Sequence, residues 1–181
     1  GRDHVTHAEL AVTNDGKFLG FKNETIANLG AYARVFGTVT PTYLFGPCAT
    51  GVYDIPAAYS NVKAVFTNTA PVDAYRGAGR PEATYTIERL VEKAAMELGI
   101  DRTEIRKQNF PKSFPFKQTL VHTVDSGDYV AGLDKAKQMA DYSGFEARRK
   151  KSEANGKLRG IGVSSYFEAC GIAPSAVVMS L

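Results

Sequence analysis

The sequence predicts an α+β fold with a mixed sheet and about four helices, and three observations support this prediction. Two strand-like runs flank a turn near residue 15, and helical start signals or helical spacing recur in the second half of the chain. The 181 residues, of which 44% are hydrophobic and 23% charged, are enough to bury a core. We expect residues 1–181 to form a single segment, with two subdomains, about 1–70 and 71–181, as the alternative.

Strands and loops are expected in the first seventy residues. Residues 5–27 are predicted to form two strands joined at the sequence NDG, a strong hairpin signal. His4 and His7 lie three residues apart, so they would face opposite sides of the first strand and would not share a metal ion. Residues 41–60 contain three prolines and two glycines, which indicate a long irregular connection or a broken helix. Residues 62–69 are expected to form a buried strand.

A long amphipathic helix is predicted from Pro81 to Gly99. Proline fits a first helical turn because its missing N–H has no partner there, and glycine commonly follows a helix end. Apolar residues recur at helical spacing, with charged residues on the other face. The inward residues are Ile87, Leu90, Val91, Ala94 and Leu98, and the outward residues are Glu88, Arg89, Glu92, Lys93 and Glu97.

Three shorter helices are expected further along the chain. Asp101 would cap one that ends near Asn109, and Asp128 would cap another that reaches about Tyr142. A fourth is expected at 144–154, followed by a turn at Asn155-Gly156. The inward residues of the third helix would be Leu133, Ala136 and Ala140, and strands are expected at 158–169 and 175–181.

The stretch AYRGAGRPEA, residues 74–83, combines two glycines and two arginines just before the long helix. Gly77 and Gly79 permit backbone conformations that a side chain disfavours. The start of a helix offers free N–H donors and partial positive charge, which suit an anion or an electron-rich oxygen. Arg76 and Arg80 would strengthen that preference. The alternative is a tight turn with two solvated arginines.

Composition argues against several classes of protein. The net charge of +3 is small and its basic residues are mostly interleaved with acids, so no nucleic-acid partner is expected. The basic run 147–157 is expected to be a solvated helix end. No apolar run is long enough for a membrane span. Cys48 and Cys170 lie in no metal-binding spacing and are expected to be buried thiols, with one disulfide left open.

The sequence TNTAPVDAYRGAGRPEATYTIERLVEKAAMELGIDRTEIRKQN, residues 67–109, resembles the signature of the molybdopterin-binding large subunit of the xanthine oxidase family. That family includes aldehyde oxidoreductases and carbon monoxide dehydrogenase-like proteins. Further matching pieces run along the chain in the family's order: GRDHVTHAELAV, ANLGAY, GVYDIP, VDSGDY and GKLRGIGVSSYFEA. The resemblance implies a molybdenum-cofactor-binding type of domain.

The resemblance also implies roles for particular residues. Arg76, Gly77, Ala78 and Gly79 would bind the cofactor, with the backbone N–H of Arg76 meeting an oxygen ligand of the metal. Ala78 and Glu168 are candidates for the substrate pocket. The pterin dithiolene would hold the molybdenum, so no side chain is expected to ligate the metal directly.

Two departures from the family's patterns narrow the substrate class. Carbon monoxide dehydrogenases carry a cysteine after the loop arginine to bridge copper to molybdenum, and this chain has Gly77. Xanthine-oxidising members carry an aromatic residue one position later, and this chain has Ala78. An aldehyde or an N-heterocycle is therefore expected rather than carbon monoxide or a purine.

The expected function is that of a part of a molybdenum hydroxylase large subunit, which oxidises its small-molecule substrate using water. Electrons would pass to iron–sulfur clusters and FAD on partner subunits or domains, in the cytoplasm or alternatively the periplasm. The chain lacks an initiator methionine and the family's C-terminal glutamate base, so we expect an inactive internal fragment with no catalytic residue of its own. The alternatives are a non-catalytic scaffold and a phosphate- or nucleotide-binding module that uses the Gly77–Gly79 loop.

Overall fold

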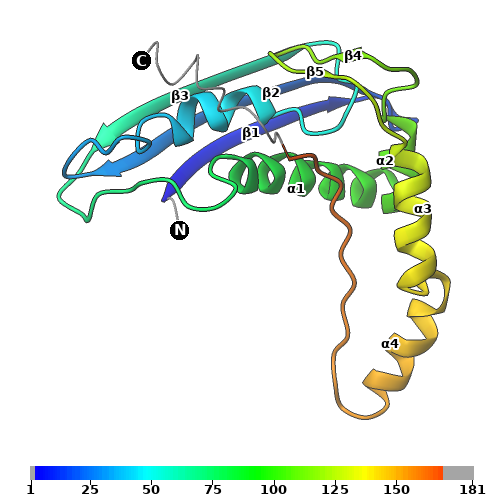
Figure 1. Cartoon of the computed structure of the whole chain (residues 1–181). Coiled ribbons are helices and arrows are strands. Elements are labelled where there is room, and N and C mark those ends of the chain that lie inside the picture. The colour runs from blue at the N-terminus through cyan, green and yellow to red at the C-terminus, as the bar shows by residue number, and fades with distance from the viewer. Residues whose placement is uncertain (1–2, 169–181) are drawn as a thin grey trace.

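A computed structural model describes residues 3–168 of the chain. Its main sheet has three strands, β1 (His4–Val12), β2 (Phe18–Gly30) and β3 (Ala58–Phe66), in the order β1-β2-β3. β1 pairs antiparallel with β2, and β2 pairs parallel with β3, so the sheet is mixed as predicted. The helix α1 (Arg80–Leu98) lies across one face of this sheet (Figure 1).

The β1–β2 hairpin forms as the sequence predicts, and a distant side chain holds its turn. Gly16 has a φ of +90°, a conformation that favours glycine. The Asn109 side chain donates to the Gly16 carbonyl at 2.8 Å and accepts from the Phe18 N–H at 2.8 Å. His4 is half-buried with its ring 5.9 Å from that of Phe45, whereas His7 is exposed, so the two histidines do face opposite sides.

The connection between β2 and β3 is a broken helix. A π-helix spans Thr40–Leu44 and a 3-10 helix spans Gly46–Cys48. Both contact β3, and the 3-10 helix also contacts α1, so this connection fills the space between the sheet edge and the helix. One of the two expectations for residues 41–60 is thereby confirmed.

The prediction of a buried strand at 62–69 is wrong in both burial and extent. β3 ends at Phe66, and its last four residues are exposed, with Phe66 62% exposed. Within residues 3–168, β3 has β2 as its neighbour on one side and lies at the edge of the sheet. A run of apolar residues indicates a strand, but burial also needs an element packed on it, and only Val62 joins the Phe45 cluster here.

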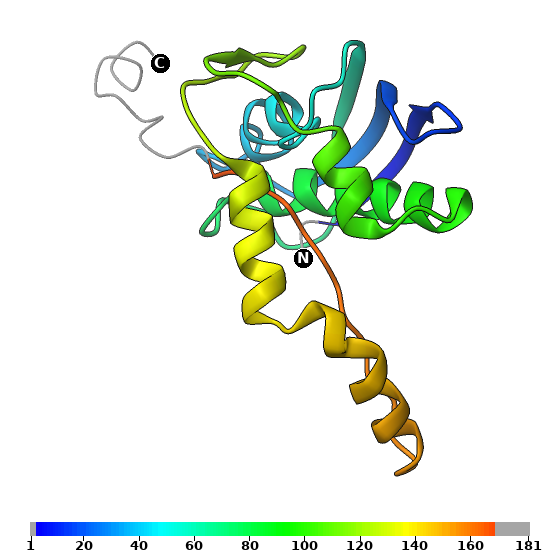
Figure 2. The same ribbon diagram turned by 90° about the vertical axis from the view of Figure 1, so that its right-hand side faces the viewer.

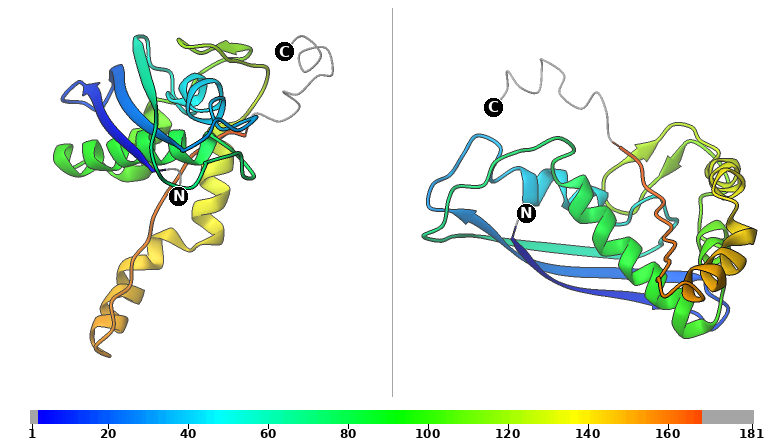
Figure 3. Two further views of the ribbon diagram at one scale, coloured as in Figure 1. Left: turned by 90° about the vertical axis from the view of Figure 1, so that its left-hand side faces the viewer. Right: turned by 90° about the horizontal axis from the view of Figure 1, so that it is seen from below.

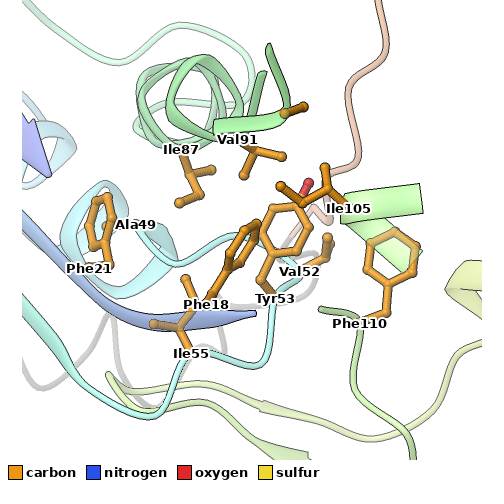
Figure 4. Close-up of a cluster of buried hydrophobic side chains, with 11 residues drawn as sticks. Phe18, Phe21, Ala49, Val52, Tyr53, Ile55, Ile87, Val91, Ile105 and Phe110 are labelled. Atoms are coloured by element: carbon orange, nitrogen blue, oxygen red, sulfur yellow. The ribbon is translucent and has the colours of Figure 1, made fainter. Parts of the chain in front are cut away.

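The core lies between α1, the hairpin and the loops that follow the 3-10 helix (Figure 4). Ile87 and Val91 of α1 are fully buried there, whereas Leu90, Ala94 and Leu98 are partly buried. The rings of Phe18 and Tyr53 meet edge to face at 5.4 Å. The inward face predicted for the long helix is therefore confirmed.

The outward position predicted for Glu88 is wrong. Its side chain is 8% exposed because α2 (Arg102–Gln108) packs beside α1 and places Arg106 against it. Arg106 Nη2 lies 2.9 Å from Glu88 Oε2, and the Tyr53 hydroxyl donates to the other Glu88 oxygen. Helical spacing identifies the face that carries Glu88, but it does not reveal that a second helix covers part of that face.

The helices α3 (Tyr129–Met139) and α4 (Phe145–Glu153) form an arm that projects from the body of the molecule (Figure 2). α3 is shorter than predicted, and a 3-10 turn at Tyr142–Gly144 separates it from α4. Leu133 packs against the core, but Ala136 and Ala140 are exposed, contrary to the prediction, because the arm leaves the body after its first turns. A small hairpin, β4 (Phe116–Lys117) with β5 (Thr123–Val124), precedes the arm.

Residues 157–168 return along the arm, and the strand predicted at 158–169 does not form over its described residues 158–168 (Figure 3). Two arginines of α2 hold this segment instead. Arg102 Nη1 donates to the Ile161 carbonyl at 2.7 Å, and Arg106 Nη2 donates to the Val163 carbonyl at 3.1 Å. A strand requires a neighbouring strand to pair with, and none lies beside this segment within residues 3–168. The strand expected at 175–181 lies outside the described residues.

Candidate cofactor-binding site

The glycine loop lies where the sequence predicts, between the end of β3 at Phe66 and the start of α1 at Arg80. Gly77 and Gly79 have φ values of +79° and +83°, in the region that favours glycine. A Cβ at Gly79 would press against the backbone of Leu44, at the end of the π-helix. At Gly77, by contrast, the nearest atom to such a Cβ would be Pro81 Cδ at 3.7 Å. Gly79 is therefore needed for packing inside the protein, whereas a Cβ at Gly77 would meet its neighbours only at ordinary contact distances.

Two successive turns shape the loop. The Ala78 N–H donates to the Tyr75 carbonyl at 2.8 Å, and the Arg80 N–H donates to the Gly77 carbonyl at 2.9 Å. Within residues 3–168, the N–H groups of Arg76, Gly77 and Gly79 donate to no backbone carbonyl. Gly79 is buried, whereas Arg76 is exposed and Gly77 is half-buried, so the N–H groups of Arg76 and Gly77 are the accessible donors for a ligand.

The two arginines of the loop differ in environment. Arg76 is exposed, as expected for a residue that faces solvent or a ligand. Arg80 is 8% exposed, and its Nη1 turns back to donate to the Ala78 carbonyl at 2.9 Å. Arg80 Nε lies 3.3 Å from Glu168 Oε1, which makes an ion pair. The other Glu168 oxygen would lie 3.9 Å from a Cβ at Gly77, so the structure brings this predicted pocket residue to the loop.

Cys48 and His122 form a contact beside the loop that sequence reasoning missed. Cys48 Sγ lies 3.4 Å from His122 Nε2, and the His122 ring meets Phe167 edge to face at 5.8 Å. The two residues are far apart in the chain and share no metal-binding spacing, so no sequence signal links them. Cys48 is a buried free thiol as expected, whereas Cys170 lies outside the described residues.

Burial and charge keep the Cys48–His122 pair neutral near pH 7. Burial raises the pKa of the Cys48 thiol to about 11, with opposing effects from Arg80, which lowers it, and Glu168, which raises it. Burial and then the positive charge of Arg80 lower the pKa of His122 below its usual value of 6.5. Of these four side chains beside the loop, Arg80 and Glu168 are therefore the ones that carry charge near pH 7.

The loop fits an oxygen ligand of a molybdenum cofactor. It offers two accessible backbone donors just before a helix start, a glycine at position 77 with no side chain to hinder approach, and the nearby charge of Arg76, all of which favour an electron-rich oxygen. Ala78 is 6% exposed, so its methyl group is turned into the protein. No group of three His, Cys, Asp or Glu side chains gathers as a metal site in the described part of the chain. No helix among residues 3–168 is long and apolar enough to cross a membrane.

Comparison with known proteins finds relatives that match most of the chain. The carbon monoxide dehydrogenase large chain of Hydrogenophaga pseudoflava is 40% identical over 182 residues, which cover 96% of this chain and 22% of that protein. The nicotine 6-hydroxylase large subunit of Paenarthrobacter nicotinovorans is 29% identical over 90% of this chain and 20% of that protein. The crystal structure of quinoline 2-oxidoreductase from Pseudomonas putida 86 superposes with a TM-score of 0.79 and 31% identity, covering 84% of this chain and 20% of that one.

The chain thus spans about one fifth of the length of the relatives that it matches. Residues 1–110, which include the sheet, the glycine loop and both α1 and α2, match the family described as the molybdopterin cofactor-binding domain. This chain belongs to the molybdopterin cofactor-binding domain family.

Proposed function

We propose that the chain is part of the large subunit of a molybdenum hydroxylase, an enzyme that oxidises an aldehyde or an N-heterocycle with oxygen from water. The observation that carries this proposal is the loop at residues 76–79, which leaves the accessible N–H donors of Arg76 and Gly77 available beside a residue that has no side chain. Membership of the family supports a molybdenum cofactor as the ligand of that loop.

The residues of this chain would bind and orient the cofactor. The molybdenum cofactor, when bound, supplies the redox chemistry and the site at which water is activated. The Arg76 N–H would donate to an oxygen ligand of the metal, and Gly77 would let that oxygen approach the backbone closely. Gly79 would keep the loop seated against Leu44. The family's glutamate base is not among these residues, and we assign no proton transfer to this chain.

The identity of residue 77 limits which substrate the proposed enzyme can oxidise. A bridging thiolate for copper needs a cysteine there, and Gly77 has no side chain to supply it. Similarity to carbon monoxide dehydrogenase therefore supports the fold and the cofactor, but not carbon monoxide as the substrate. The likeness to quinoline 2-oxidoreductase and to nicotine 6-hydroxylase supports an N-heterocycle, and an aldehyde is the other candidate.

Partner chains are part of the same proposal. Two of the relatives reported above are named as a large chain or a large subunit, which supports an assembly with smaller subunits. We propose that iron–sulfur clusters and FAD on such partners accept the electrons.

The test uses the complete parent protein with its co-purifying subunits. Molybdenum and pterin analysis comes first, followed by turnover of quinoline, nicotine-type heterocycles, aldehydes, carbon monoxide and xanthine with an artificial electron acceptor. We expect about one molybdenum per large chain and turnover confined to heterocycles or aldehydes. A molybdenum-free preparation that is instead stabilised by a nucleotide or by phosphate would contradict the proposal.

A further inference from the structure

We propose that Glu168 is a positioning residue, whose ion pair with Arg80 holds the loop at residues 75–80 in the conformation that presents its N–H donors. This inference rests on the proposed function, because the donors are those proposed to meet the cofactor. Under this proposal Glu168 is not the base of the reaction. Arg80 holds the loop in place in addition to supplying positive charge.

The Arg80 guanidinium contacts both the loop backbone and Glu168. Its Nη1 donates to the Ala78 carbonyl at 2.9 Å, and its Nε lies 3.3 Å from Glu168 Oε1. The Ala78 carbonyl belongs to the second of the two turns, so the guanidinium fixes that turn from inside the protein. The planar fork of arginine can make both contacts together, whereas a lysine ammonium is a single point charge.

The buried positive charge of Arg80 requires a negatively charged partner. Arg80 is 8% exposed, and a buried cation is stable only when it is paired and hydrogen-bonded. Its neighbours Cys48 and His122 stay neutral near pH 7, the first because its pKa is raised and the second because its pKa is lowered. Glu168 is the carboxylate that faces Arg80 here. Its side chain is 42% exposed, so it can be changed without opening the core.

The fold of the return segment places Glu168 beside the loop. This residue lies in the return segment that follows α4. This segment is tied to α2 through the Ile161 and Val163 carbonyls, and Phe167 packs against the core beside Glu168. The carboxylate is thus placed beside the loop by the body of the molecule. Glu168 would therefore act on the loop as a fixed support rather than as a surface charge.

The experiment compares Glu168→Gln, Glu168→Asp and Arg80→Lys in the complete parent protein. Glu97→Gln is the matched control, because it removes an exposed carboxylate that lies 3.6 Å from Lys93 on α1. Hydrogen exchange of the Ala78 and Arg80 amides is measured on protein produced without molybdate. Molybdenum content, and turnover per bound molybdenum, are measured on protein produced with it.

We expect Glu168→Gln and Arg80→Lys to speed exchange of these two amides by roughly 5- to 30-fold, while the core amide of Val91 keeps its rate. Molybdenum content should fall below that of Glu97→Gln, and turnover per bound molybdenum should stay near wild type. Glu168→Asp, which keeps the charge, should restore part of the protection. Arg80→Lys can affect folding more broadly, and Glu168→Gln then decides the question alone.

Two results would overturn the inference. One is loop exchange in Glu168→Gln that equals that of Glu97→Gln. The other is lost turnover at full molybdenum content with unchanged loop exchange, which would make Glu168 a catalytic group. A wild-type parent that contains no molybdenum would instead contradict the proposed function, and the exchange measurement would still test the ion pair.

Discussion

Gly77 and Gly79 occupy nearly the same backbone conformation but do different things. The side of Gly79 where a Cβ would stand is filled by Leu44, with its Cβ 2.6 Å away, whereas the nearest atom to a Cβ at Gly77 would be 3.7 Å away. Gly79→Ala should therefore destabilise the protein by about 2–5 kcal/mol, from backbone strain plus overpacking. Gly77→Ala should cost about 1–2 kcal/mol from strain alone. Chemical denaturation of the two variants measures this difference.

A third glycine provides the control for Gly77. Gly99, at the end of α1, has a φ of +67° and no atom within 4 Å of a Cβ placed there. Gly99→Ala should therefore match Gly77→Ala in stability. In the parent protein, only Gly77→Ala should lower molybdenum content, and it should do so more than Arg76→Lys. Equal molybdenum content in Gly77→Ala and Gly99→Ala would count against the loop as the cofactor contact.

His122 makes stability depend on pH. Burial, followed by the charge of Arg80, lowers its pKa below 6.5 in the folded state, so the unfolded chain binds more protons below that pH. The stability that this histidine contributes should be present in full above pH 6.5 and should be lost progressively as the pH falls from that value through the lower pKa of the folded state. Denaturation midpoints measured from pH 7.5 to 5 should fall, and His122→Gln should flatten this part of the curve. His7→Gln, at an exposed site on β1, is the control and should leave the slope in place.

At the scale of elements, α2 depends on its N-cap. Asp101 Oδ1 accepts from the Thr103 N–H at 2.8 Å and the Glu104 N–H at 3.2 Å, and its other oxygen accepts from the Tyr142 hydroxyl at 3.0 Å. Although burial raises the pKa of Asp101, these hydrogen bonds outweigh it and lower that pKa overall. Asp101→Ala should destabilise the protein by about 1–2 kcal/mol. Asp101→Asn keeps an acceptor and should restore most of the loss in denaturation experiments.

The contact between α1 and α2 depends on a buried ion pair. Arg106 is fully buried, its Nε and Nη2 lie 3.0 and 2.9 Å from Glu88 Oε2, and its Nη1 lies 3.5 Å from Glu92 Oε2. Arg106→Leu would leave Glu88 buried without its cation, so we expect a loss of about 3–5 kcal/mol in unfolding free energy. Arg149→Leu, on exposed α4, also removes an ion-paired arginine and should change stability by less than about 1 kcal/mol. Similar losses in the two variants would contradict this assignment.

Local sequence patterns predicted which helices, strands and turns form better than they predicted which residues pack against them. The glycine loop, the hairpin turn and the cap at Asp101 depend on nearby residues, and all three form. The burial of Glu88 depends on Arg106, which approaches from another helix. The 157–168 segment has an apolar alternation typical of strands, but arginine side chains hold its backbone instead. The Cys48–His122 contact joins distant positions, which one sequence cannot pair.

At the scale of the whole molecule, this chain carries one wall of a proposed site. The loop supplies donors, but no base is assigned to residues 1–181, and the relatives are about five times longer. We expect the isolated 181-residue chain to show no turnover of quinoline, nicotine or any aldehyde, although the parent protein turns over. Steady-state assays of both proteins with the same acceptor measure this. Turnover by the isolated chain would contradict this expectation, because it would show that the 181 residues are sufficient for activity.

The sheet and α1 should unfold together. The core joins Phe18 and Tyr53, before residue 70, to Ile87 and Ile105, after it. We therefore propose that residues 1–110 behave as one cooperative unit rather than as two subdomains divided at residue 70. Denaturation followed by tyrosine fluorescence and by far-ultraviolet circular dichroism should give coincident transitions. Separate transitions would favour the two-subdomain alternative.

The turn at the tip of the arm offers a place to attach a label. Gly156 has a φ of +67° with open space around it, and the residues on either side are exposed. Exposed turns that carry no packing contacts tolerate insertions and are the preferred sites of nicking. A short epitope or a fluorophore site between Asn155 and Gly156 would therefore report on assembly while leaving the glycine loop untouched. A protease that nicks this tip would leave α4 joined to the body through α3, and would leave the return segment held by Arg102 and Arg106 of α2.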